Sequence, residues 1–183
     1  MKVLILGHGR HGKDTVAEIL EHTHGLTFQS SSRAACEIFI YDVLRKRWPG
    51  AYQDIEDCYD DRHNHRELWK ELITEYNPPH DKAKLCKAIL AKNDCYVGMR
   101  CPLEYAASKD LFDVVIWVDA LKRHPKDPTM LIERDESMIV IDNNSHLLNL
   151  KLNVLDRIPH DENSDLSRTD YRSGTTRPID DYT

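Results

Sequence analysis

Short, nearly all-apolar runs recur along the chain. They cover residues 3–6, 114–118 and 138–141, and a weaker run covers residues 95–99. Runs of this length, rich in β-branched residues and without alternation of apolar and polar positions, are typical of parallel strands buried on both faces. A further strand is expected just before the serines at positions 30–32. The pattern therefore predicts a parallel sheet of roughly five strands.

Longer segments with apolar residues at helical spacing lie between these runs. In one of them Leu68, Leu72 and Tyr76 recur at helical intervals. Strands that alternate with helices predict an α/β fold in which helices sandwich the sheet and the crossovers are right-handed. The region from about residue 33 to 92 is expected to be a mostly helical insertion. The expected helices cover residues 13–22, 33–48, 62–76, 81–91 and 145–155.

The composition indicates one domain. The chain has 183 residues, 40% of them hydrophobic, which is enough for a single core. Its net charge of −6 provides no overall basic surface of the kind that adheres to nucleic acid. The polar, aperiodic residues 159–183 are expected to form a flexible tail, which leaves residues 1–158 as the domain.

Cysteine usage and hydropathy suggest where the protein works. Five scattered cysteines without a CxxC pair favour reduced thiols in a cytoplasmic protein. The N-terminal apolar run is too short for a signal peptide or a membrane span, so no membrane association is expected. The oligomeric state leaves no signal in the sequence.

A glycine-rich segment follows the first apolar run directly and leads into the first expected helix. It fits the phosphate-binding pattern G-x-x-x-x-G-K, whose backbone N–H groups and helix N-terminus hold phosphate while the lysine reaches the β- and γ-phosphates. A glycine-rich turn without a ligand is the alternative, and a dinucleotide site lacks the acidic residue expected about twenty residues on. The segment predicts ATP binding by Gly7, His8, Gly9, Arg10, His11, Gly12 and Lys13, followed by Asp14 and Thr15.

The variant Gly12-Lys13-Asp14-Thr15 resembles the loop of bacteriophage deoxynucleoside monophosphate kinases, which carry Gly-Lys-Asp at this point. Two further segments are similar to that family: residues 96–100 with Glu104, and residues 140–144 before a leucine-rich helix. The resemblance covers most of residues 1–158. It implies a P-loop NTPase fold of the nucleotide-kinase type, ATP and Mg²⁺ as cofactors, and a deoxynucleotide acceptor.

The chain departs from this family just before Arg100, where Gly98 and Met99 replace an acidic residue. A carboxylate that could help to hold magnesium is therefore missing there. Mg²⁺ often takes only one or two protein ligands besides phosphate oxygens. Asp14, directly or through water, and the hydroxyl group of Thr15 are the expected metal ligands.

Arginines are the other candidate site residues, because phosphoryl transfer depends on positioning and charge stabilisation. Arg100 follows a central strand at the edge where open α/β sheets bind ligands, and arginine suits bidentate phosphate contacts. Arg33 follows Ser30–Ser32, of which Ser31 or Ser32 is expected to cap the next helix. The predicted catalytic residues are Lys13, Arg100, Arg66, Arg123 and Arg134, and the predicted substrate-binding residues are Arg33, Arg62, Arg66 and Arg100.

Two pairs of arginines are assigned to regions outside the phosphate loop. Arg62 and Arg66 lie four residues apart and are expected on one basic helix face, where either neighbouring carboxylates or a substrate phosphate neutralise them. Arg123 and Arg134 flank a polar stretch at about residues 121–136. This stretch stands where nucleotide kinases carry a lid that closes over the ATP phosphates, although an ordinary surface loop fits equally well.

These residues predict an ATP-dependent kinase that phosphorylates a deoxynucleotide, most similar to the phage deoxynucleoside monophosphate kinases. No general base is evident, which favours an acceptor that is already an ionised phosphate. One alternative is a P-loop kinase that phosphorylates the hydroxymethyl group of 5-hydroxymethyluracil in phage DNA. A second alternative is a regulator that binds ATP without transferring phosphate.

Overall fold

The computed structural model describes residues 1–158, and the predicted tail at 159–183 lies outside them. A five-stranded sheet of order β2-β3-β1-β4-β5 forms the centre, and every neighbouring pair of strands is parallel. The predicted α/β fold class, a parallel sheet sandwiched by helices, is confirmed, and a glycine-rich loop joins the first strand to the first helix as expected. The strands are β1 (Val3–Leu6), β2 (Phe28–Ser30), β3 (Cys95–Val97), β4 (Val114–Asp119) and β5 (Ile139–Asp142).

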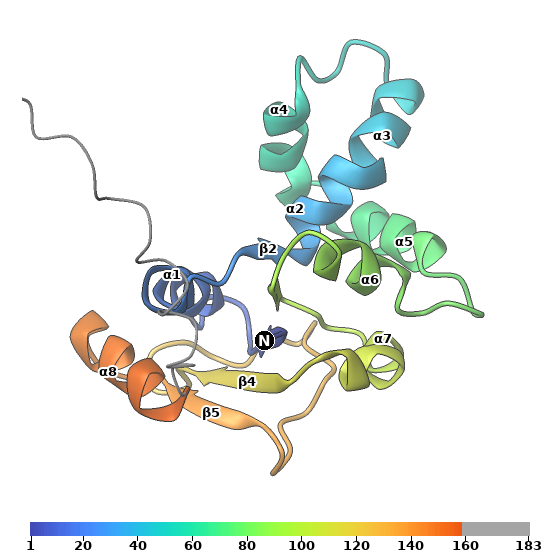
Figure 1. Cartoon of the computed structure of the whole chain (residues 1–183). Coiled ribbons are helices and arrows are strands. Elements are labelled where there is room, and N and C mark those ends of the chain that lie inside the picture. The colour runs from blue at the N-terminus through green and yellow to red at the C-terminus, as the bar shows by residue number, and fades with distance from the viewer. Residues whose placement is uncertain (159–183) are drawn as a thin grey trace, which may run out of the picture.

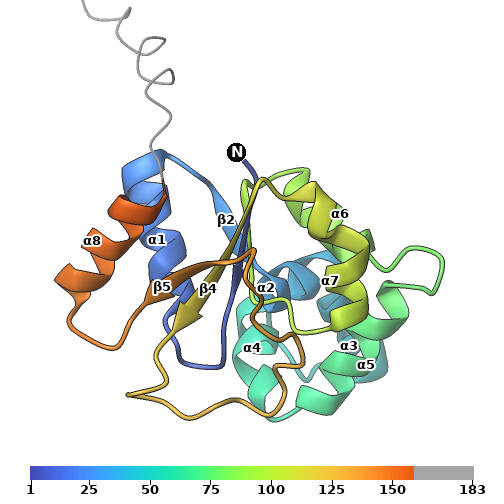
Figure 2. The same cartoon turned by 90° about the horizontal axis from the view of Figure 1, so that it is seen from below.

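The central strand β1 buries both faces, as its unbroken apolar run predicts. Along β1, Leu4 and Leu6 belong to one hydrophobic cluster, whereas Val3 and Ile5 belong to the other. The second cluster is covered by α1 (Lys13–His24) and α8 (Leu147–Arg157). The remaining helices cover the opposite face, so the molecule has three layers (Figure 2).

Figure 1 shows the helices of the opposite face above and to the right of the labelled strands. None of the helices within residues 1–158 is both long and apolar enough to cross a membrane. In chain order these elements are α2 (Ser31–Ala35), the π-helix η1 (Cys36–Ile40), α3 (Tyr41–Arg47), α4 (Ile55–Asp60), the 3₁₀-helix η2 (Asp61–His63), α5 (Arg66–Tyr76), α6 (Lys84–Leu90), α7 (Pro102–Ser108) and the 3₁₀-helix η3 (Lys109–Leu111).

The single helix predicted for residues 62–76 is wrong at its start. Arg62 lies in η2, and α5 begins only at Arg66. Asp61 causes the break, because its carboxylate accepts hydrogen bonds from Asn64 Nδ2 at 2.6 Å and from Tyr52 at 2.9 Å, and pairs with His65 at 3.0 Å. Such polar side chains offer the backbone an alternative to helix. Arg62 and Arg66 therefore do not share a helix face.

Two short helices were not predicted. Asp54 begins α4 by accepting hydrogen bonds from the backbone N–H groups of Glu56 at 2.9 Å and Asp57 at 3.0 Å. Pro102 occupies the start of α7, where its fixed φ suits a helix and its missing N–H has no cost. Both starts carry recognisable capping signals, but each helix is too short to show a clear apolar period.

A buried carboxyl group on α7 makes the stability of the protein depend on pH. Glu104 is 5% exposed and accepts a hydrogen bond of 2.8 Å from the hydroxyl group of Tyr96 on β3. Burial raises the pKa of Glu104 to about 7, although the bond from Tyr96 opposes this shift. The folded protein therefore holds this proton to a higher pH than the unfolded chain does.

The free energy of unfolding should fall as the pH rises from about 4.5 to about 7, because only the unfolded chain releases the Glu104 proton over that range. The shift corresponds to roughly 3 kcal/mol. Glu104→Gln keeps a hydrogen-bond acceptor for Tyr96 but cannot titrate, so urea unfolding of this variant should lack that part of the pH dependence. Parallel pH profiles for the two proteins would contradict the assignment.

Candidate active site

The loop between β1 and α1 needs glycine at two positions. Gly7 has φ 141° and Gly12, the N-cap of α1, has φ 87°, both in a region that side chains rarely adopt. A Cβ on Gly7 would lie 2.6 Å from the carbonyl oxygen of Val118, and one on Gly12 would collide with the amide nitrogen of Asn143. The glycines therefore serve both the turn and its close contact with the ends of β4 and β5.

The side chains of two histidines of this loop pack inside the protein. His11 is fully buried, and its Nδ1 accepts a hydrogen bond of 3.1 Å from the backbone N–H of Ala120. His8 packs its ring edge-on against Trp117, with the ring centres 5.5 Å apart. The side chains of His8 and His11 are thus held in the protein, and only their backbone is available to line the loop.

Lys13 and Arg100 lie together at the loop. The ammonium group of Lys13 donates a 2.8 Å hydrogen bond to the carbonyl oxygen of His8. Burial and the neighbouring charge of Arg100 lower the pKa of Lys13 to about 8, while Asp14 and Asp127 oppose that shift. The structure brings the lysine of the phosphate-binding pattern and the arginine after β3 to one edge of the sheet, as predicted.

The carboxylate of Asp127 lies near both Lys13 and Arg100, although the sequence did not indicate a role for it. Its carboxylate accepts a 2.7 Å hydrogen bond from Arg100 and one of 3.2 Å from the backbone N–H of Gly9. Burial alone would raise the pKa of Asp127, but the hydrogen bonds from Thr129 and the charge of Arg100 hold it well below its usual range. The signal in the sequence was weak: an acidic residue between Pro125 and Pro128 in the predicted lid-like stretch.

The segment between β4 and β5, which contains the predicted lid-like loop at 121–136, has neither helix nor strand. Its later part is anchored, since Met130, Ile132 and Met138 are buried in the cluster that the α2–α7 helices cover. Its earlier part is held mainly by polar contacts. Arg123 donates hydrogen bonds of 3.3 Å to the carbonyl oxygens of Asn143 and Ser145.

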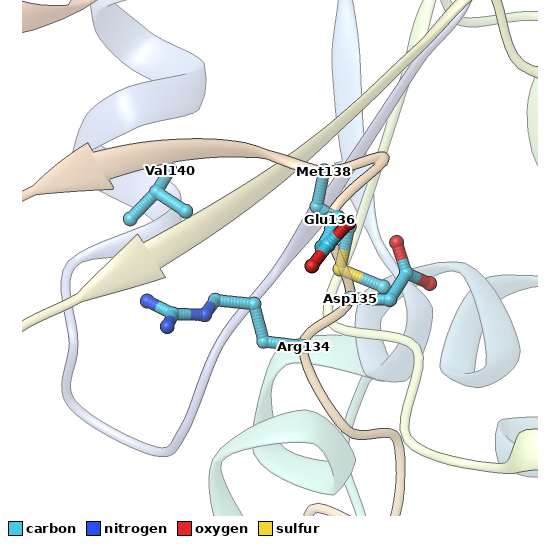
Figure 3. A pocket seen from close by; sticks show the side chains of 5 residues that line it. All are labelled: Arg134, Asp135, Glu136, Met138 and Val140. Carbon is cyan, nitrogen blue, oxygen red and sulfur yellow. The ribbon is translucent and has the colours of Figure 1, made fainter.

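Arg134 has a different partner from Arg123. Its guanidinium group is 3.9 Å from the carboxylate of Asp119 at the end of β4. Figure 3 shows this group pointing away from Asp135 and Glu136 in a hollow of about 430 Å³. The hollow is lined by Arg134, Asp135, Glu136, Met138 and Val140, and no residue of the phosphate-binding loop lines it. We therefore place the candidate site at the loop and not in this hollow.

The N-terminus of α2 adjoins the lysine. The hydroxyl group of Ser31 donates a 3.3 Å hydrogen bond to the carbonyl oxygen of Gly98, and a Cβ on Gly98 would lie 4.0 Å from Cε of Lys13. The predicted cap at Ser31 or Ser32 is wrong, because Ser30 accepts the capping bond from the backbone N–H of Arg33 at 3.3 Å. Because Ser30 is the cap, the hydroxyl groups of Ser31 and Ser32 are available for other contacts, with Gly98 and Tyr59 respectively.

Tyr59 on α4 continues this surface. Its hydroxyl group is 3.5 Å from that of Ser32, and the guanidinium groups of Arg62 and Arg33 lie 3.9 Å and 5.1 Å from the centre of its ring. Arg62 also donates a 2.8 Å hydrogen bond to the carbonyl oxygen of Tyr59. A continuous run of contacts therefore leads from Lys13 through Gly98 and the serines to Tyr59 and two predicted arginines.

The predicted arginines of this region differ in their partners. Arg33 donates 2.6 Å hydrogen bonds to both Glu56 and Glu37, and these carboxylates raise its pKa. The side chain of Arg66 is exposed and makes no hydrogen bond or ion pair with any residue in 1–158. Carboxylates thus neutralise Arg33, whereas the guanidinium groups of Arg62 and Arg66 are not paired with acidic side chains within the described chain.

The predicted metal ligands lie in the first turn of α1. Asp14 is exposed and Thr15 is half-buried. Residues 1–158 contain no group of three or more His, Cys, Asp or Glu side chains that could hold a metal ion. Asp14 carries a carboxylate and Thr15 a hydroxyl group, and both are oxygen donors of the kind that Mg²⁺ takes.

Comparisons with known proteins find similar structures but no matching family model or curated sequence. A gluconokinase from Sinorhizobium meliloti 1021 is 13% identical over 85% of this chain and 89% of its own, with a TM-score of 0.45. A sugar kinase from Janibacter sp. HTCC2649 is 17% identical over 86% of this chain and 95% of its own, with a TM-score of 0.41. Likenesses this distant do not bear on the reaction or the substrate.

Proposed function

We propose that this protein is an ATP-dependent kinase that transfers the γ-phosphoryl group to a small acceptor. One observation carries the proposal: Lys13 and Arg100 converge on a glycine-rich loop at the carboxyl edge of a parallel sheet, and the backbone N–H of Gly9 in this loop already binds a carboxylate, that of Asp127. Ligands of open α/β sheets bind at this edge. In this reading the backbone N–H groups and Lys13 bind the β- and γ-phosphates, and Arg100 stabilises the charge on the group in transit.

Magnesium completes this site through few protein contacts. Asp14 and Thr15 are the side chains that would hold it, directly or through water, beside the phosphates. When bound, Mg²⁺ would supply positive charge that neutralises the phosphates. Lys13 then keeps the phosphates against the loop, while its neighbour Asp14 lies near the positive end of the α1 dipole, a favourable place for a carboxylate.

We further propose a deoxynucleoside monophosphate as the acceptor. The support is the resemblance of Gly12-Lys13-Asp14-Thr15 to the loop of the phage kinases, together with the surface that leads from Lys13 to Tyr59. Arg62 lies on that surface, and its guanidinium group, like that of the exposed Arg66, does not pair with a carboxylate among residues 1–158. An acceptor phosphate would neutralise them, and its ionised oxygen needs no strong base at pH 7.

The test offers radiolabelled ATP and Mg²⁺ to four acceptors: deoxynucleoside monophosphates, plain DNA, DNA containing 5-hydroxymethyluracil, and a sugar acid. Label in a deoxynucleoside diphosphate is the expected result. Label in modified DNA or in the sugar acid would keep the kinase but overturn the acceptor. ATP binding without transfer to any of the four would favour a regulator, and absence of ATP binding would overturn the kinase proposal itself.

A further inference from the structure

Both oxygens of the Asp127 carboxylate accept hydrogen bonds. One oxygen, Oδ2, accepts hydrogen bonds from the guanidinium group of Arg100 at 2.7 Å and from the backbone N–H of Gly9 at 3.2 Å. The other, Oδ1, accepts from the backbone N–H of Thr129 at 2.9 Å and from its hydroxyl group at 2.7 Å. Thr129 therefore fixes the orientation of the carboxylate, and Oδ2 faces the phosphate-binding loop.

The two donors to Oδ2 are donors that a nucleotide phosphate would use. A backbone N–H group of a glycine-rich loop and a guanidinium group are both typical phosphate contacts. The carboxylate is also in close contact with the loop, because a Cβ on Gly9 would lie only 2.7 Å from Oδ2. A phosphate oxygen and Oδ2 cannot occupy this position together, and their negative charges would repel each other at any neighbouring one.

We propose that Asp127 is a built-in competitor for nucleotide: its carboxylate takes the place of a phosphate oxygen at Gly9 and Arg100, and nucleotide must displace it to bind. This inference rests on the proposed function, since it concerns the same loop. Residues 125–129 then form a strap across the phosphate site, and this strap opens as nucleotide enters.

The construction of the segment agrees with this role. The contacts of Asp127 with the loop are polar, and its own backbone N–H donates a 3.2 Å hydrogen bond to Nδ1 of His8. Beyond Thr129 the chain is anchored by the buried side chains of Met130 and Ile132. The strap can therefore leave the loop without exposing core. Pro125 and Pro128 restrict its unbound conformations, which lowers the entropy lost when it binds the loop.

The test compares Asp127→Asn with the matched control Asp135→Asn. Asp135 lies in the same segment, and its Oδ1 accepts from Ser137 N–H at 2.8 Å and from the Ser137 hydroxyl group at 2.5 Å, as Asp127 does from Thr129. It makes no contact with the loop among the contacts of residues 1–158. Both substitutions remove one negative charge from the segment and keep an oxygen for the local turn, but only Asp127→Asn weakens the contact with Gly9 and Arg100.

Titration calorimetry should use pyrophosphate with a chelator, so that no metal contributes, and ATP with Mg²⁺. Asp127→Asn should bind pyrophosphate about tenfold more tightly than the unchanged protein, since a charge-assisted competing contact is gone. Asp135→Asn should bind within about twofold of the unchanged protein, because such a difference is under half a kcal/mol. Thermal unfolding of each variant checks that both are folded.

Each other outcome overturns the inference. Equal pyrophosphate affinity in the three proteins would show that Asp127 does not compete. Weaker binding of ATP with Mg²⁺ by Asp127→Asn would make Asp127 a ligand for the metal or the nucleotide and not a competitor. If none of the three proteins bound either probe, the proposed function would fail together with the strap, whereas the first two results leave the kinase assignment in place.

Discussion

Replacing Lys13 with alanine should remove phosphoryl transfer almost completely while the protein stays folded. Lys13 supplies a positive charge at the loop, and the loss of a preorganised charge contact to a transferring group costs on the order of 100-fold or more in kcat. In the folded protein the ammonium group donates one hydrogen bond, to the carbonyl oxygen of His8. The free energy of unfolding should therefore change by only about 1 kcal/mol.

The measurement is the rate of label transfer from ATP, alongside thermal unfolding of the same samples. Lys87→Ala is the control, because Lys87 is an exposed lysine on α6 paired with Asp81 at 2.8 Å. It removes the same charge away from the loop and should retain its activity. Retained transfer in Lys13→Ala, in a folded sample, would contradict the assignment of residues 7–13 as a phosphate-binding loop.

Replacing Gly7 with alanine should have the largest effect on stability. The new Cβ would lie 2.6 Å from the carbonyl oxygen of Val118, which belongs to β4 and cannot move without disturbing the sheet. The backbone of Gly7, at φ 141°, is also strained for any side chain. We expect a loss of roughly 3 kcal/mol or more in the free energy of unfolding, and loss of ATP binding because the loop must shift.

Gly25→Ala is the control that separates the effect of the contact with Val118 from the effect of the backbone conformation. Gly25 ends α1 with φ 66°, and a Cβ there would meet no atom within 4 Å. Only the backbone cost remains, about 1–2 kcal/mol, and ATP binding should persist. Urea unfolding and calorimetric ATP titration of both variants provide the comparison. Equal losses of stability at the two positions would mean that the contact with Val118 is unimportant.

The features that the sequence predicted well are encoded within a few neighbouring residues. The apolar run before Gly7 gave β1, and the glycine spacing with Lys13 gave a strand–loop–helix that the structure contains. Arg100 was placed at the loop because the carboxyl ends of parallel strands share one edge of a sheet. These inferences needed only local pattern and general topology.

The features that it missed depend on contacts between distant segments. Asp127 meets Gly9 from more than a hundred positions away, and no local pattern records that contact. Arg33 was expected to be available to a substrate, yet Glu56 on another helix pairs with it. The shared face of Arg62 and Arg66 failed for a different reason, since side-chain hydrogen bonds of Asp61 outweighed a helical spacing that continued through the break.

The central position of β1 bears on how the protein is made. Val3 pairs with Cys95 on one side and with Val114 on the other, so the first strand to be synthesised has no sheet partner until most of the helical region has been made. Pairings this distant in sequence form slowly and leave apolar strands exposed meanwhile. The glycine-rich loop, which follows β1 and contacts β4, therefore takes its final shape late in folding. Conditions that stall synthesis before residue 95 would leave an aggregation-prone strand at the start of the chain.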